Sequence, residues 1–356
     1  MITRRTLTAA GLAATATTAL ARSKMKKPLV IAHRGASGER PEHTLMAYRL
    51  AIAQGCDFIE PDLVVTKDGH LVVRHENEIA GTTDVAARPE FAARKTRKVI
   101  DGETITGWFT EDFTLAELKT LRARERLPAL RRGSAAFDGQ DTIPTFQEVI
   151  DLAKAESRRL GRTIGTYPEM KHPTYFAGIG LPIEQRLADV LKTNDLNSRT
   201  APVFVQCFEV APLKAYGLIG KARRVMLVSQ GPAPVDVTTA AGVKAISAFA
   251  EGLGPEWPLV ISSKDGTLGS PTNLVRNAHA AGMAIHPWTV RAENTFLPKS
   301  LQRGSVPSDH GDAGALLTAL YASGVNGVFS DFPGLAVKVR DFAMSGKGHG
   351  TPYPPA

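Results

Sequence analysis

Residues 58–65 read Phe-Ile-Glu-Pro-Asp-Leu-Val-Val, an apolar run interrupted by two carboxylates and a proline. Aromatic and β-branched residues favour a strand, and residues two apart on a strand lie on the same face of the sheet. Glu60 and Asp62 therefore share one face of a predicted buried strand. A tight Asp-Gly turn follows, and Leu71–Val73 is predicted to return as the second arm of a hairpin.

Similar short apolar runs recur outward from this strand and alternate with stretches of helical spacing. Without the hairpin's return arm, they predict eight strands: Val30–His33, Phe58–Val65, Thr163–Glu169, Val203–Phe208, Arg224–Val228, Ala245–Phe249, Ala284–Thr289 and Gly327–Ser330. The helices predicted between them include Pro41–Ala53, Thr145–Arg159, Ile183–Leu191, Thr272–Ala281 and Ala313–Ala322. Eight strands that alternate with helices in a chain of 356 residues indicate an α/β protein with a TIM (β/α)8 barrel. A doubly wound open sheet is the alternative.

Residues 77–142 break this alternation. The segment is rich in Arg, Thr, Gly and Pro, and only one short helix is predicted in it, near Leu115–Leu121. We therefore expect a small insertion near the barrel mouth, within a domain that spans about residues 28–340 and precedes a C-terminal tail at 341–356. The densest basic run, residues 94–98, has no interleaved aromatic residue, so we expect no nucleic-acid partner.

The first 21 residues have the pattern of an export signal. Arg4 and Arg5 precede an alanine-rich apolar run, and residues 19–21 offer the small-x-small site that signal peptidases cleave. The arginine pair indicates twin-arginine export to the periplasm of a bacterium or to the medium, and the run is too short for a stable membrane anchor. A frayed N-terminal helix is the alternative. Cleavage removes both arginines and lowers the net charge from +8 to +6, an excess that suits an anionic substrate.

The two cysteines, Cys56 and Cys207, form neither a CxxC pair nor a metal-binding cluster in the sequence. Cys56 comes just before one predicted strand, and Cys207 lies at the far end of another. The two residues should thus lie at opposite faces of the barrel, too far apart for a disulfide. We expect two buried thiols.

Polar or aromatic side chains mark the C-terminal ends of six of the eight predicted strands. They are His33 with Arg34, Glu60 with Asp62, Glu169 with Lys171, Gln206, Trp288 and Asp331. In a TIM barrel these strand ends form the floor of the active site. Carboxylates and cations are costly to bury there without a function, and metal binding is the simplest explanation.

Glu60, Asp62 and Glu169 make an all-oxygen set of three carboxylates. Such a set favours a hard cation, Ca²⁺ or Mg²⁺, over zinc, which recruits His or Cys. A bound ion would offset the repulsion between the carboxylates and polarise a phosphoryl oxygen. The alternative is that the three residues form ordinary surface salt bridges.

His33 and His75 are the candidate proton-transfer pair. An ordinary histidine pKa of about 6.5 lets one ring abstract a proton while the other donates one near neutral pH. For each histidine, a structural role in the core is the alternative. Arg34 directly follows His33 and can hold a phosphate through two hydrogen bonds. The glycine-containing loop at 35–38 lets backbone N–H groups approach a bound anion.

Five motifs between His33 and His75 carry a resemblance to a known family. They are H-R-G-A-S-G at 33–38, P-E-H-T at 41–44, I-E-P-D at 59–62, T-K-D-G at 66–69 and V-V-R-H at 72–75. In this order and spacing, the chain resembles the glycerophosphodiester phosphodiesterase family. Four later segments resemble its periplasmic bacterial branch: Y-P-E-M-K at 167–171, V-Q-C-F at 205–208, H-P-W-T-V-R at 286–291 and S-D-F-P at 330–333. The resemblance covers about residues 28–340.

The resemblance implies a TIM barrel that hydrolyses glycerophosphodiesters, the deacylated phospholipids, to sn-glycerol 3-phosphate and an alcohol. It implies one divalent cation, usually Ca²⁺ in the periplasmic branch, with Mg²⁺ as the alternative. The residues that match the family's functional positions are Glu60, Asp62 and Glu169 for the metal, His33 and His75 for catalysis, Arg34 and Lys171 near the phosphate, and Trp288 at the glycerol pocket. Glu76 departs from the family pattern, which typically has Asp there, and we expect it to retune His75 without removing its role.

In the mechanistic hypothesis, one histidine removes the proton of the glycerol 2-hydroxyl and the other protonates the leaving alcohol. The cyclic phosphate that forms is then opened by water with the two roles reversed. Direct attack by water is the alternative, and the sequence does not assign acid and base to individual histidines.

Two other functions compete with this hypothesis. A phospholipase C- or D-like enzyme acting on intact lipids would need an apolar docking rim, which an aromatic content of 6% does not favour. A non-catalytic phosphoester-binding protein would not need both histidines together with three carboxylates. We therefore expect a small-molecule substrate, and the sequence leaves the oligomeric state open.

Overall fold

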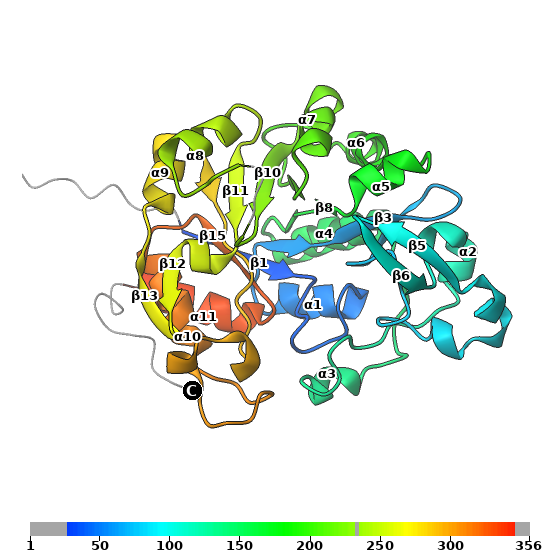
Figure 1. The fold of residues 1–356 in the computed structure, drawn as a ribbon, viewed down its shortest axis with the longest axis horizontal. Coiled ribbons are helices and arrows are strands. Elements are labelled where there is room, and N and C mark those ends of the chain that lie inside the picture. Colours follow the sequence, from blue (N-terminus) through cyan, green and yellow to red (C-terminus); the bar gives the residue numbers. More distant parts are fainter. Residues whose placement is uncertain (1–26, 232–234, 346–356) are drawn as a thin grey trace, which may run out of the picture.

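The computed structural model describes residues 27–231 and 235–345. The predicted export signal at 1–21 and most of the predicted tail at 341–356 lie outside these described residues. Parallel strands form the centre of the molecule, and helices surround them (Figure 1). In chain order the strand segments are β1 (Leu29–His33), β2 (Phe58–Glu60) continued by β3 (Asp62–Val65), β7 (Gly165–Thr166) continued by β8 (Glu169–Met170), β9 (Phe204–Cys207), β10 (Arg223–Val228), β11 (Gly252–Pro255), β14 (Ala284–Ile285) and β15 (Gly327–Ser330).

The strands close into a barrel. Each segment pairs in parallel with its neighbours, in the orders β15-β1-β2-β7 and β11-β10-β9-β8-β3, with β14 beside β11. The backbone N–H of Phe329 donates to the carbonyl of Pro287 at 2.9 Å, and a parallel bridge joins Val290 to Ser330. These contacts connect the first strand group to the last, so the chain forms the predicted TIM barrel.

Proline interrupts two barrel strands that were predicted as continuous. Pro61 separates β2 from β3, and Pro168 separates β7 from β8. Because proline has no backbone N–H to donate to the ladder, the pairing breaks at these residues. On either side of the break β2 pairs with β7 and β3 pairs with β8, so both halves remain in the barrel wall.

Four aromatic and two aliphatic side chains fill the inside of the barrel below the strand ends. Because these side chains come from strands all around the closed sheet and contact one another, they meet at its axis; they are Ile31, Phe58, Tyr167, Phe204, Val225 and Phe329. The rings of Tyr167 and Phe204 stack with centroids 4.9 Å apart. A second, larger apolar cluster joins the outer faces of the strands to the helices. The packed interior gives the strand ends a rigid base.

The surrounding helices are α1 (Leu45–Ala53), α4 (Phe146–Leu160), α5 (Pro173–Gly178), α6 (Ile183–Thr193), α7 (Val210–Ile219), α8 (Ala240–Ser247), α9 (Leu274–Ala280), α10 (Ala313–Ala322) and α11 (Pro333–Met344). The predicted start of α1 at Pro41 is wrong by one turn. The hydroxyl of Thr44 accepts from the N–H of Ala47 at 3.1 Å and caps the helix, and the positive φ of His43, 58°, is incompatible with a helix.

The predicted strand Ala245–Phe249 does not form. These residues end α8 and the turn after it, and Val243 and Ile246 are buried at a helical spacing of three. The sixth barrel strand is β11 instead. At Gly252 and Gly254 a Cβ would lie 3.0 Å and 2.6 Å from side-chain atoms of the neighbouring strand, so glycine lets β11 pack closely against β10. Glycine and proline are poor strand formers, which concealed β11 in the sequence.

Residues 77–142 lie between the return arm β4 (Leu71–Val73) and α4. They contain η1 (Val85–Ala87), η2 (Pro89–Arg94), β5 (Thr96–Ile100), β6 (Glu103–Gly107), η3 (Thr110–Asp112), α2 (Leu115–Leu118) and α3 (Arg132–Ala135). The helix predicted at 115–121 is therefore present but shorter. The β5–β6 hairpin was not predicted; its two-residue turn is Asp101-Gly102, with φ of 50° and 86°. The hairpin and α2 lie together on one side of the barrel (Figure 1).

Two further segments interrupt the alternation. Between β11 and α9 lie η4 (Trp257–Leu259) and the antiparallel pair β12 (Ile261–Lys264) and β13 (Thr267–Pro271). Between β14 and α10 lie η5 (Asn294–Phe296) and η6 (Lys299–Leu301). Cys56 and Cys207 are both buried and free, as predicted. Within residues 27–231 and 235–345, helices that are both long and apolar enough to cross a bilayer are absent.

Candidate active site

Strand register brings the predicted site residues into one row. His33 of β1 is paired with Glu60 of β2, and Asp62 of β3 is paired with Glu169 of β8. Glu169 is in turn the partner of Gln206 on β9. Because adjacent parallel strands present these residues at the same height, residues more than one hundred positions apart in the sequence meet at the C-terminal face of the barrel.

Glu60, Asp62 and Glu169 form a buried carboxylate cluster. One oxygen atom from each lies within 4.8 Å of the others. Glu60 accepts hydrogen bonds from the side-chain amide of Gln206 at 2.9 Å and from the backbone N–H of Arg34 at 2.8 Å. The Oδ1 atom of Asp62 is buried and has no hydrogen-bond partner. An unpaired carboxylate oxygen beside two further carboxylates fits a hard divalent cation, so the cluster can hold a metal ion.

The electrostatics of the cluster agree with this role. Burial, together with repulsion from Asp62 and Glu169, raises the pKa of Glu60 well above its ordinary value. Burial and repulsion from Asp62, which outweigh the attraction of Lys171, raise the pKa of Glu169 to about 8. Burial alone would raise the pKa of Asp62 as well, but the contact with His43 holds it well below its ordinary value. The site therefore concentrates more negative charge than its own residues neutralise.

His43 is a site residue to which the sequence analysis gave no role. Its Nε2 atom lies 2.8 Å from Oδ2 of Asp62, and its Nδ1 atom lies 2.9 Å from the hydroxyl of Tyr48. The ring is fully buried. It fixes one oxygen of Asp62 and leaves the other for the cluster. The motif P-E-H-T at 41–44 contained this histidine, and the turn before α1 places it.

His33 is held between a carboxylate and a cation. Its Nδ1 atom lies 2.6 Å from Oδ1 of Asp331, and the Nε–H of Arg34 donates to its Nε2 atom at 3.2 Å. Burial and the nearby charge of Arg34 lower the pKa of His33 to about 4. The ring is therefore neutral at pH 7, with its proton on Nδ1 and a lone pair on Nε2.

His75 has the same arrangement on the opposite side of the cluster. Its Nδ1 atom lies 2.6 Å from Oε1 of Glu76, and the ammonium of Lys171 donates to its Nε2 atom at 3.1 Å. Burial and the charges of Arg34 and Lys171 lower the pKa of His75 to about 3. Glu76, the residue that departs from the family pattern, thus contacts His75 directly.

Arg34 and Lys171 connect the two histidines to the carboxylate cluster. The Nε atom of Arg34 is 3.4 Å from Oδ2 of Asp62, and the Nζ atom of Lys171 is 3.0 Å from Oε1 of Glu169. A guanidinium nitrogen of Arg34 also pairs with Glu42 at 3.2 Å. Two permanent cations therefore face the cluster from its two ends, where they can meet the oxygens of a phosphate.

Trp288 borders the site through Phe208. The two rings pack edge to face with centroids 5.5 Å apart, and the ammonium of Lys171 lies 5.9 Å from the centroid of Phe208. The indole N–H of Trp288 donates to the carbonyl of Gly254 at 2.8 Å. All eight residues predicted for the site are thus joined by direct contacts or through Phe208.

The sequence analysis assigned no role to two further residues behind His33. Asp331 was noted as a strand end but given no role, and Arg131 lies in the irregular insertion. Arg131 donates to Oδ2 of Asp331 at 2.5 Å, to Glu293 at 2.6 Å and to the carbonyl of Ser37 at 2.9 Å. No local pattern marks Arg131, because its partners come from three distant segments.

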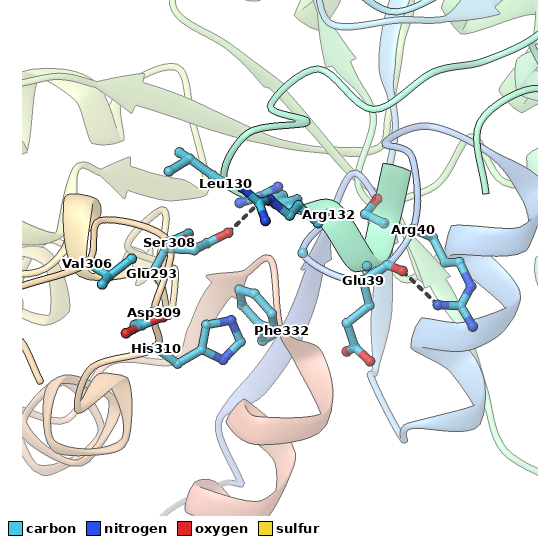
Figure 2. Close-up of a pocket in the computed structure, with 14 residues that line it drawn as sticks. Glu39, Arg40, Leu130, Arg132, Glu293, Val306, Ser308, Asp309, His310 and Phe332 are labelled. Atoms are coloured by element: carbon cyan, nitrogen blue, oxygen red, sulfur yellow. Dashed lines mark hydrogen bonds and ion pairs between the residues drawn. The ribbon is translucent and has the colours of Figure 1, made fainter. Parts of the chain in front are cut away.

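A separate cavity of about 650 Å³ lies on the far side of Arg131. Figure 2 shows its lining, which includes Glu39 and Arg40 after β1, Arg132 of the insertion, and His310 with Phe332. None of the eight predicted site residues lines this cavity. The carboxylate cluster is therefore a different site, and the Arg131–Asp331 pair lies between the cavity and His33.

Comparisons with known proteins identify the family of this chain. A model described as the glycerophosphoryl diester phosphodiesterase family matches residues 33–335. A glycerophosphodiester phosphodiesterase of Arabidopsis thaliana is 33% identical over 328 residues, which cover 86% of this chain and 84% of that protein. One of Haemophilus influenzae is 29% identical, with 90% and 92% covered. The solved structure of an Oleispira antarctica phosphodiesterase in complex with the product sn-glycerol-3-phosphate has a TM-score of 0.59 at 23% identity, with 88% of this chain and 97% of that chain covered.

Proposed function

Because this chain belongs to the glycerophosphoryl diester phosphodiesterase family and is a glycerophosphodiester phosphodiesterase, we propose how its residues perform that hydrolysis. Glu60, Asp62 and Glu169 hold one divalent cation, and His33 and His75 exchange the protons. The substrates are deacylated phospholipids, and the products are sn-glycerol 3-phosphate and an alcohol. One observation carries the proposal: the three carboxylates converge within 4.8 Å, with a histidine and a cation at either end.

The histidines act through Nε2. Each Nδ1 atom is already bonded to a carboxylate, so only Nε2 is available to the substrate. One Nε2 takes the proton of the glycerol 2-hydroxyl as that oxygen bonds to phosphorus. The other histidine takes up a proton from solvent at Nε2 when the negative charge of the bound phosphodiester raises its pKa, and it gives that proton to the oxygen of the leaving alcohol as the phosphorus–oxygen bond breaks. Water then opens the resulting cyclic phosphate with the two roles reversed.

Arg34 and Lys171 neutralise the phosphoryl oxygens. In the structure their hydrogen bonds go to the two histidines and to the carboxylates, and an anionic substrate between them can accept those bonds instead. This exchange orients the phosphate beside both Nε2 atoms. The divalent cation, when bound, supplies Lewis-acid polarisation of a phosphoryl oxygen and lowers the pKa of a coordinated hydroxyl.

We assign Ca²⁺ as the preferred cation and Mg²⁺ as the alternative. A donor set of carboxylate oxygens supports a hard cation of this kind, and the preference for Ca²⁺ over Mg²⁺ rests on the resemblance to the periplasmic branch of the family. The test is release of glycerol 3-phosphate from glycerophosphocholine, glycerophosphoethanolamine, glycerophosphoglycerol and glycerophosphoinositol after EDTA treatment, with either ion added back. Restoration by Zn²⁺ alone would overturn the assignment.

The same assay tests the substrate class and the cyclic route. Intact phosphatidylcholine in liposomes should not be hydrolysed at a comparable rate, and preference for liposomes would favour the phospholipase-like alternative. A diester that lacks the 2-hydroxyl should be nearly inert. Its turnover at full rate would exclude the cyclic phosphate and leave direct attack by water.

We propose further that the chain is exported from a bacterial cytoplasm through residues 1–21. Support comes from the Arg4-Arg5 pair and from the small-x-small site at 19–21. N-terminal sequencing of the protein from the periplasm or medium should find Arg22 first. The Arg4→Lys, Arg5→Lys double variant should stay in the cytoplasm, because twin-arginine export requires the pair. Cytoplasmic, uncleaved wild-type protein would refute export.

A further inference from the structure

A chain of three ionisable side chains, Glu76, His172 and Asp101, connects His75 to the tip of the insertion. Oε1 of Glu76 lies 2.6 Å from Nδ1 of His75, and Oε2 of the same carboxylate lies 2.9 Å from Nε2 of His172. Nδ1 of His172 lies 2.6 Å from Oδ2 of Asp101. Asp101 is the first turn residue of the β5–β6 hairpin, so the chain ends in the segment that interrupts the barrel.

The protonation of His172 makes this chain continuous. An imidazole between two carboxylates can satisfy both only when both of its nitrogens carry protons. Burial alone would lower the pKa of His172, but its hydrogen bonds to Glu76 and Asp101 raise it. His172 is therefore a cation that binds Glu76 on one side and Asp101 on the other.

Glu76 depends on this cation for its orientation. Its side chain is 46% exposed, and an exposed glutamate has several accessible rotamers that do not reach His75. The bond to His172 selects the rotamer that places one oxygen against Nδ1 of His75. His172 has a φ of 46°, a costly conformation for a residue with a Cβ, and the two hydrogen bonds offset that cost.

The insertion also reaches the other histidine. Arg131 is a buried insertion residue that binds Asp331, the carboxylate partner of His33. Each ring is therefore bonded at Nδ1 to a carboxylate whose second oxygen contacts another residue. For His33 the carboxylate is Asp331, and its second oxygen is bonded to Arg131 of the insertion. For His75 the carboxylate is Glu76, and its second oxygen is bonded to His172, which in turn binds Asp101 of the insertion. Two separate parts of the insertion, the β5–β6 hairpin and Arg131, therefore contact the two carboxylates that hold the histidines, the hairpin through His172 and Arg131 directly.

We propose that Asp101 and His172 are positioning residues for His75: the β5–β6 hairpin fixes the catalytic ring through His172 and Glu76. The proposal rests on the proposed function in one respect, the role of His75 in proton transfer. His75 faces Arg34 and Lys171 on its cationic side and Glu76 and Asp62 on its anionic side. Loss of Asp101 lets Glu76 turn away, so Nε2 of His75 is misdirected while the metal cluster and Trp288 stay in place.

The conformation of the turn allows substitutions of Asp101 that should not disturb the hairpin. Asp101 has a φ of 50°, which glycine and asparagine both tolerate. Asp101→Gly removes the carboxylate and keeps the turn, and Asp101→Asn keeps a neutral acceptor for His172. Glu103 is the first residue of β6, and its side chain makes no hydrogen bond or ion pair among the described residues. Glu103→Gln is therefore a matched control that changes charge by the same amount. His75→Ala tests the proposed function separately.

The experiment measures kcat, KM and the pH profile of kcat for glycerophosphocholine hydrolysis in the full-length protein with Ca²⁺. Asp101→Gly should lower kcat about tenfold, the usual order for the loss of a side chain that orients a site ligand, and change KM less than about twofold. Asp101→Asn should recover most of that loss, and Glu103→Gln should match the wild type in kcat and in its pH profile.

The outcomes separate the two claims. If Asp101→Gly matches Glu103→Gln in kcat while His75→Ala is inactive, the positioning role is wrong and the catalytic role of His75 stands. If His75→Ala keeps near-normal kcat, the proposed function is wrong at that residue. Equal losses of kcat in Asp101→Gly and Asp101→Asn, with KM raised in both, would show that Asp101 only stabilises the position of the hairpin, and this result would overturn the proposal.

Discussion

Removal of the bound cation should force the active site to take up protons. Oxygens of Glu60, Asp62 and Glu169 lie within 4.8 Å of one another. Two full charges at that distance repel by about 3.5 kcal/mol at an effective dielectric constant of about 20. Lys171 and Arg34 offset only part of this repulsion, so the metal-free protein relieves the rest by protonation.

The expected number of protons follows from the pKa of Glu169. A pKa of about 8 leaves this carboxyl about nine-tenths protonated at pH 7, and Glu60 is raised in the same direction. Because the ion binds the ionised form, each ion bound at pH 7 should release about one proton or more. The apparent affinity for the cation should therefore increase with pH between about pH 6 and 7. If one proton is released per ion, the increase should be about tenfold per pH unit.

Calorimetric titration with Ca²⁺ measures this number directly. The observed binding enthalpy of EDTA-stripped protein, plotted against the ionisation enthalpy of several buffers, has a slope equal to the protons exchanged. Glu169→Gln should reduce both the slope and the affinity, and the exposed Glu103→Gln should change neither. A slope near zero at pH 7 in the wild type would refute the reasoning, since it would mean that the three carboxylates stay ionised together without an ion.

Three further predictions follow from the geometry. His33→Ala should lower kcat about a hundredfold or more with an unchanged melting temperature. His70→Ala is the control, because the side chain of His70 is 55% exposed, and it should leave kcat unchanged. Near-normal turnover by His33→Ala would remove His33 from the mechanism. His43→Ala should destabilise the protein to urea by about 2 kcal/mol and weaken Ca²⁺ binding about tenfold or more, because Asp62 loses its partner; an unchanged Ca²⁺ affinity would contradict this role. Trp288→Ala should raise KM for glycerophosphodiesters more than it lowers kcat, because the ring borders the site without contacting either histidine. Steady-state kinetics measure both constants. Equal losses in kcat and kcat/KM would show that Trp288 binds the transition state instead.

The sequence was sufficient where a residue's position follows from its strand. Glu60, Asp62 and Glu169 lie at strand ends, and the parallel register alone brings them together. The eight-strand barrel could be predicted for the same reason, since most strands carry an apolar β-branched run. The exception was β11, whose glycines pack closely against side chains of β10; this contact appears only when the neighbouring strand is in place.

The residues that the sequence did not reveal act across the fold. His43 is placed by a turn before α1 that was predicted as helix, and its contact with Asp62 spans two separate elements. Arg131 and Asp101 come from an insertion without a regular pattern, and their partners lie 200 and 71 positions away. Contacts of this kind depend on how the insertion packs on the barrel, which hydrophobic periodicity does not encode.

The matching environments of the two histidines bear on how one site can run both steps of the reaction. Each ring has a carboxylate at Nδ1 and a cation at Nε2, and the cations are among the causes that lower both pKa values. A phosphodiester that binds Arg34 and Lys171 brings negative charge to the Nε2 side, so it raises the pKa of both rings from the same direction. Neither histidine is built as a permanent acid or a permanent base. Since the second step requires the roles of the first to be reversed, two rings in similar environments suit it better than a pair with fixed and different pKa values.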